Sequence, residues 1–129
     1  MKTDREIAEY WYGELIDSLR LISSEFCIQE AVLPEFVHIP DEVLNSFPID
    51  SLHTIFKEGL VSQVQLERLM EFDALLEMIQ LPSDYDDMLE VMRSGAEFRS
   101  LRGKAIELLE YLGHKYEEPK VNAIYVKGS

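Results

Sequence analysis

The sequence predicts a mainly α-helical fold, a single-domain bundle of about four to six helices with a short irregular or β-like C-terminal tail. Apolar residues recur at helical spacing, helix-start motifs precede them, and glycine or proline follows them. The length of 129 residues fits one domain, and a hydrophobic share of 47% can supply its core. We therefore expect residues 1–129 to form one helical domain.

The first predicted helix begins at a capping box, in which Thr3 and Glu6 satisfy free backbone amides. Its apolar residues follow at steps of three and four, and the pattern continues until Pro34. This face comprises Ile7, Trp11, Leu15, Leu19, Ile22 and Phe26. The next stretch, about residues 33–50, contains three prolines and is predicted to be a connector with only short helical turns, one of them capped by Asp41.

Two short helices are predicted from their start signals. The stretch "SLHTIFKEG" can be capped by Asp50 or Ser51, and Gly59 ends it with a left-handed stop. A later short helix can be capped by Ser83 or Asp84 and leads into the last helix.

A longer helix is predicted between these two. It begins at a second capping box, formed by Ser62 and Gln65, and runs to about Gln80. At about 100° per residue, one side of this helix is apolar and the opposite side is acidic. The apolar arc comprises Val64, Leu69, Phe72, Leu75, Leu76 and Ile79; the acidic side comprises Glu67, Glu71, Asp73 and Glu77 with Leu66, Met70 and Met78 among them. We therefore expect apolar side chains and negative charge on one surface.

The last strong helix, "SGAEFRSLRGKAIELLEYLG", is closed by Gly113. Its expected inward face comprises Phe98, Leu101, Ala105, Leu108 and Leu112. About residues 114–129 form the C-terminal tail, where only residues 121–126 favour β structure.

The net charge of −13 is concentrated in the first part of the chain. Residues 1–92 hold 20 acidic and 5 basic side chains (−15), while residues 93–129 hold 5 acidic and 7 basic ones (+2). The electrostatic field of this negative charge repels nucleic acid and anionic membranes and favours a cationic partner. No signal peptide or apolar membrane span is recognised, and a lone cysteine fits a reducing compartment, so we expect a cytoplasmic protein.

No pattern of catalytic, cofactor-binding or metal-binding residues is recognised in the sequence. The six glycines form no phosphate-binding loop, and His38, His53 and His114 are scattered. Cys27 lies among apolar residues and is expected in the core. The sequence therefore predicts a protein that is not an enzyme and uses no cofactor or metal.

The stretch "LPSDYDDMLE" can be interpreted in several ways. A calcium loop is excluded, because Met88 stands at the third ligand position and Leu89 at the position of the turn glycine. A catalytic carboxylate pair stays possible, and so does simple stabilisation of a helix start by negative charge. Residues 67–90, however, hold eight acids and only one base, Arg68, which a partner with a basic cleft would explain.

Three segments, "QLERLMEFDALLEMI", "PSDYDDMLE" and "EFRSLRGKAIELLEYLG", resemble the small acidic immunity proteins of contact-dependent growth inhibition and other polymorphic toxin systems. The matching features are Phe72-Asp73, Asp84 to Asp87, Phe98-Arg99 and Leu112-Gly113. The resemblance implies a protein that neutralises a cognate toxin domain, expected to be a nuclease, in a one-to-one complex. It would cover a basic active site or an adjacent surface with an acidic helical face.

The predicted partner-binding residues are Glu67, Met70, Glu71, Glu77, Met78, Asp84, Tyr85, Asp86, Asp87 and Glu90. The aspartates would bind basic toxin residues, and Tyr85 would be an aromatic anchor. A cytoplasmic secretion chaperone or an acidic adaptor protein stays an alternative to the immunity protein.

Overall fold

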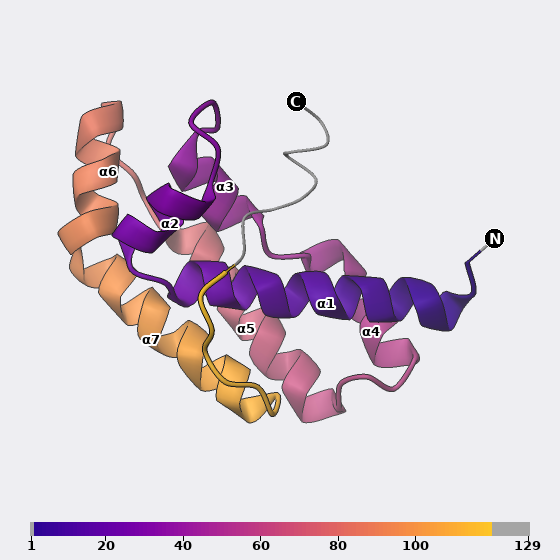
Figure 1. Ribbon diagram of the computed structural model, residues 1–129. Helices are drawn as coiled ribbons and strands as arrows, with labels where there is room; N and C mark the ends of the chain where they lie inside the picture. Colours follow the sequence, from indigo (N-terminus) through magenta and orange to yellow (C-terminus); the bar gives the residue numbers. More distant parts are fainter. Residues whose placement is uncertain (1, 120–129) are drawn as a thin grey trace.

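The computed structural model describes residues 2–119 and confirms the mainly α-helical fold (Figure 1). Its elements are α1 (Asp4–Ser23), α2 (Phe26–Val32), α3 (Ile39–Asn45), the 3-10 turn η1 (Ile49–Ser51), α4 (Leu52–Lys57), α5 (Gln63–Met78), α6 (Tyr85–Ser94) and α7 (Ala96–Tyr111). No strand occurs among the described residues. The β-favouring run at 121–126 lies outside them.

The long helix α1 crosses the molecule, and the other helices are arranged around it (Figure 1). Its most extensive contact is with α7, and α4 and α3 also pack against it. α7 in turn contacts both α5 and α6, while α6 also packs on α2 and α3. α7 is therefore the element that connects α5 with α6.

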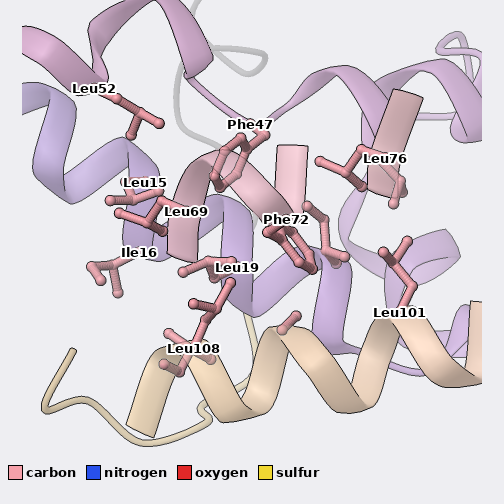
Figure 2. Close-up of a cluster of buried hydrophobic side chains, with 14 of the residues drawn as sticks. Leu15, Ile16, Leu19, Phe47, Leu52, Leu69, Phe72, Leu76, Leu101 and Leu108 are labelled. Carbon is pink, nitrogen blue, oxygen red and sulfur yellow. The ribbon is translucent and has the colours of Figure 1, made fainter. Parts of the chain in front are cut away.

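The core lies where α1, α5 and α7 meet (Figure 2). Leu15, Leu19 and Leu69 are fully buried, and the rings of Phe47 and Phe72 pack edge to face with centroids 5.5 Å apart. Burying one such side chain contributes about 1.5–3 kcal/mol. The predicted inward face of α7 is confirmed: Phe98, Leu101, Ala105 and Leu108 are buried, and Leu112 packs against the core.

The first predicted helix is divided, because α1 ends at Ser23 and α2 begins at Phe26. The hydroxyls of Ser23 and Ser24 both donate to the carbonyl of Arg20, at 3.1 and 2.7 Å. Ser24 itself is extended, with φ −77° and ψ 151°. Serine side chains that bond to the backbone compete with helix continuation. The turn still leaves Phe26 in the core, as the apolar spacing predicts.

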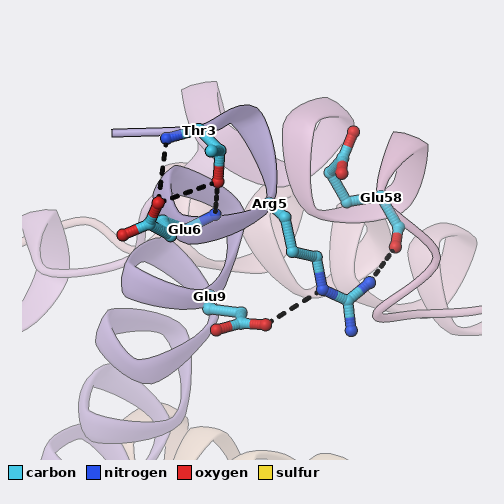
Figure 3. Close-up of polar contacts among 5 residues, drawn as sticks. All are labelled: Thr3, Arg5, Glu6, Glu9 and Glu58. Atoms are coloured by element: carbon cyan, nitrogen blue, oxygen red, sulfur yellow. Dashed lines mark hydrogen bonds and ion pairs between the residues drawn. The ribbon is translucent and has the colours of Figure 1, made fainter. Parts of the chain in front are cut away.

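The predicted capping box of α1 is present (Figure 3). The backbone amide and the hydroxyl of Thr3 donate to the Glu6 carboxylate, at 3.2 and 3.0 Å, and the Glu6 amide donates to the Thr3 hydroxyl. The backbone hydrogen bond from Thr3 is the main reason why the pKa of Glu6 is lowered. Arg5 pairs with Glu9 at 2.9 Å and donates to the Glu58 carbonyl, which joins α1 to the end of α4.

Two other local predictions are also confirmed. Ser62 and Gln65 form the capping box of α5, with donor–acceptor distances of 2.8 and 3.1 Å. Gly59 and Gly113 have φ angles of +78° and +88°, the left-handed conformation in which a glycine ends a helix without steric cost.

Two other predictions are wrong. The cap of α3 is His38, not Asp41, because Nδ1 of His38 accepts a hydrogen bond from the Asp41 amide at 3.3 Å. Pro40 then occupies the first turn, where its missing amide costs nothing. Cys27 is exposed rather than part of the core, because it lies about 100° around α2 from the buried Phe26.

Residues 114–119, the described part of the tail, form no regular secondary structure and cross α1 (Figure 1). The Tyr12 hydroxyl is 2.9 Å from Nε2 of His114, and the Tyr116 hydroxyl is 2.9 Å from Oγ of Ser24. Arg20 donates to the carbonyl of Lys115 through two nitrogens. Side chains of α1 therefore hold this part of the tail in place.

Candidate partner-binding surface

The ten predicted partner-binding residues lie on two helices. The α5 group comprises Glu67, Met70, Glu71, Glu77 and Met78, and the α6 group comprises Asp84, Tyr85, Asp86, Asp87 and Glu90. All ten are exposed. α5 and α6 make little direct contact and both pack on α7, so the two acidic groups are supported by the same helix.

The α5 group covers the outward side of its helix. At about 100° per residue, Glu67, Glu71 and Met78 fall within one narrow arc, roughly opposite the buried Leu69 and Leu76. Met78 is 71% exposed. Carboxylates and a large apolar side chain therefore share one surface, as the sequence predicts.

The limits of that surface differ from the prediction. Leu66, expected among the acids, is only 4% exposed and belongs to the core, so that expectation is wrong. Val64 and Leu75, expected in the core, are 50% and 37% exposed. Helical periodicity fixes angles between residues of one helix, but the positions of α4 and α7 decide which arc is covered.

Two further acids extend the negative surface of α5. The pKa of Asp73 is raised, first because burial disfavours its charge and then because Glu77 and Asp50 repel it. Asp50 belongs to η1, far from Asp73 in the sequence. Sequence reasoning left both Asp50 and Asp73 out of the predicted binding residues, and only the packing of η1 near α5 brings their charges together.

The charges of the α6 group are partly satisfied within the protein. The Asp84 side chain is the N-cap of α6 and accepts from the Asp87 amide at 3.2 Å. Asp86 and Asp87 lie in the first turn, where negative charge interacts favourably with the helix dipole. Glu90 pairs with Arg93 at 2.8 Å. Stabilisation of the helix start therefore explains part of this cluster without a partner.

Tyr85 lies apart from the neighbouring acids. Its ring packs against the ring of His38, with centroids 5.0 Å apart and planes tilted by 49°. It lies on the side of α6 that also carries the buried Met92, about 100° around the helix from Asp86. The side chain is 39% exposed, so one part packs on α3 and another part faces solvent.

A groove runs between α5 and α7, beside the α5 group. Its volume is about 360 Å³, and its lining residues are Leu75, Met78, Ile79, Ala96, Glu97, Ser100, Leu101 and Lys104. Sequence reasoning missed this groove because it assigned Leu75 to the core. Which residues of α7 line the groove depends on how much of α7 is covered by α5.

The opposite ends of α5 and α7 are joined by other contacts. There the guanidinium of Arg68 lies 5.3 Å from the centre of the Tyr111 ring, and Nε2 of Gln65 donates to the Tyr111 carbonyl at 3.4 Å. These contacts join the start of α5 to the end of α7. The groove lies between the C-terminal half of α5 and the N-terminal half of α7.

No group of three or more His, Cys, Asp or Glu side chains within residues 2–119 is arranged to hold a metal ion. In the same part of the chain, every helix is too short or too polar to cross a lipid bilayer. Comparison of the chain with protein-family models, curated proteins and solved structures gives no match.

Proposed function

We propose that this protein is an immunity protein that binds one cognate toxin domain and blocks its active site or a surface beside it. The observation that carries the proposal is the α5 group, in which carboxylates surround exposed methionines. Among the described residues, neither Glu71 nor Glu77 forms an ion pair. Their negative charge is therefore available to a partner.

The chemistry of a nuclease explains why such a surface can inhibit it. A nuclease holds phosphates with lysine and arginine side chains, and carboxylates form short, charge-assisted hydrogen bonds with the same groups. Apolar side chains between the carboxylates add buried contact area. The protein would then exclude nucleic acid by binding alone, in the cytoplasm and without a cofactor.

The two acidic groups contribute differently in this proposal. The α5 group supplies both unpaired charge and apolar contact, so it should determine how long the complex lasts. The α6 group has part of its charge engaged in the helix start and in the pair with Arg93, so it should mainly accelerate encounter. Tyr85 would contribute through its exposed part.

The direct test uses the toxin domain that we expect the reading frame next to this gene to encode. Titration calorimetry should give a one-to-one complex, and nuclease activity should fall to zero at equal amounts of the two proteins. Association should slow as salt rises. A neighbouring frame that encodes an injected effector, held by this protein before secretion, would instead support the secretion chaperone.

A further inference from the structure

The groove between α5 and α7 has an apolar floor that is open to solvent. Leu75 and Met78 are 37% and 71% exposed, and Ile79 and Leu101 continue the floor inward. Its volume of about 360 Å³ lies near the lower end of the range of about 300–1,000 Å³ for binding pockets. It therefore suits a few large side chains rather than an extended ligand.

The lining of the groove holds one carboxylate and one cation, and a second carboxylate lies one helical turn away. Glu97 lies on the α7 wall, and Glu71 lies one turn before Leu75 on the outer side of α5. Within the described part of the chain, neither carboxylate has an ion-pair partner. Lys104 is the cation of the lining. A segment that enters the groove would thus meet apolar contacts at the centre, and two carboxylates against one cation at the edge.

From this arrangement we infer that the groove binds the apolar face of a basic amphipathic helix of the partner. The inference rests on the proposed function and specifies the partner segment: leucine or phenylalanine side chains on one face, flanked by lysine or arginine. Such helices commonly bind by placing an apolar face in a groove between two helices. A second copy of this chain is a poor occupant, because two chains of net charge −13 repel each other.

The test needs no knowledge of the natural partner. The probe is a synthetic helical peptide of about 15 residues, with leucines on one face and lysines on the other. Its control is the same peptide with every leucine replaced by alanine, so that charge is constant. The methyl NMR signal of Met78 should shift on titration with the leucine peptide, whereas that of the fully buried Met92 should not.

Four variants distinguish binding in the groove from a general attraction to the negative charge of the protein. Met78→Lys should weaken the leucine peptide about tenfold or more, whereas Val64→Lys, the same charge change at another exposed site of α5, should weaken it less than about threefold. Ser100→Trp, which fills the groove, should also weaken it. Lys104→Gln should strengthen binding about two- to fivefold, because it removes the repelling cation. Circular dichroism verifies that each variant stays helical.

The outcomes distinguish this inference from the proposed function. Binding of the leucine peptide that depends on Met78 and Ser100, with weak binding of the alanine peptide, supports the groove. If both peptides bind equally, or if Met70 shifts instead of Met78, the groove inference is overturned while the acidic surface stays supported. Absence of binding by either peptide overturns the groove as well, and the toxin titration then decides the proposed function independently.

Discussion

α5 and α6 are both acidic helices packed on α7, yet they use their charge differently. In α6, the cap by Asp84 and the pair between Glu90 and Arg93 involve the carboxylates in holding the helix together. In α5, Glu71 and Glu77 have no ion-pair partner within residues 2–119, and Met78 stands beside them in solvent.

The difference shows how acidic clusters of similar sequence can be distinguished. A run of acids at a helix start has a structural explanation whenever a cap is present, because the dipole favours negative charge there. Acids in the middle of a helix, next to exposed apolar residues, have no such explanation. α5 is therefore the stronger candidate for binding, although "DYDD" is the more conspicuous sequence.

The largest expected effect is the difference in stability between substitutions on the buried and on the exposed side of α5. Phe72→Ala should lower the free energy of unfolding by about 3–5 kcal/mol, because Phe72 is 2% exposed and packs against Phe47. Met70→Ala, on the exposed side, should change it by less than about 0.5 kcal/mol. Chemical denaturation of both variants measures the contrast. Equal losses would mean that Met70 is also part of the core.

The next effect concerns α6. Tyr85→Ala should lower the free energy of unfolding by about 1–2 kcal/mol, since it removes the ring contact with His38 and leaves part of α3 uncovered. Tyr85→Phe keeps the ring and should preserve stability. Thermal unfolding followed by circular dichroism compares the two. An unchanged melting temperature for Tyr85→Ala would show that the contact contributes nothing to the fold.

A smaller effect tests the structural role of the α6 acids. Asp84→Ala should cost about 1 kcal/mol of stability, because the Asp87 amide loses its acceptor. Asp84→Asn retains an acceptor at the cap and should cost clearly less, while it removes the charge. Urea unfolding measures both. A large loss of partner binding in Asp84→Asn with unchanged stability would assign this charge to binding rather than to the helix start.

The smallest effect is a pH dependence at Asp73. Its pKa is raised above the ordinary 3.8, mainly by burial and then by Glu77 and Asp50, so the folded state binds this proton more tightly than the unfolded state. The free energy of unfolding should therefore fall as pH rises from about 3.8 through the raised pKa. Asp73→Asn should remove this fall and be more stable than the wild type at neutral pH. A variant that is less stable there would contradict the assigned repulsion.

The local features of the fold can be predicted from the sequence because they depend on residues that are neighbours along the chain. The capping boxes at Thr3 and Ser62 and the stops at Gly59 and Gly113 involve residues within one turn of each other. The break at Ser24 is less visible, because serine is compatible with a helix until its hydroxyl bonds to a backbone carbonyl.

The candidate site can be predicted only in part from the sequence, because it depends on contacts between helices and not only on neighbours along the chain. Periodicity places Met70 and Met78 correctly outside the core. It misplaces Leu66 and Leu75 because it does not show how α4 and α7 pack against α5. The groove and the charge of Asp50 near Asp73 arise only from tertiary packing. The orientation of Tyr85 toward His38 likewise requires α3 to be in place.

The most direct test of the account compares two triple charge reversals in stopped-flow binding to the cognate toxin domain. One changes Glu67, Glu71 and Glu77 to lysine, and the other changes Asp84, Asp86 and Asp87 to lysine. Both should slow association at low salt, but only the α5 variant should also accelerate dissociation, with a loss of affinity of about a hundredfold or more. Wild-type affinity and full neutralisation by both variants would contradict the proposal that these acids bind the toxin.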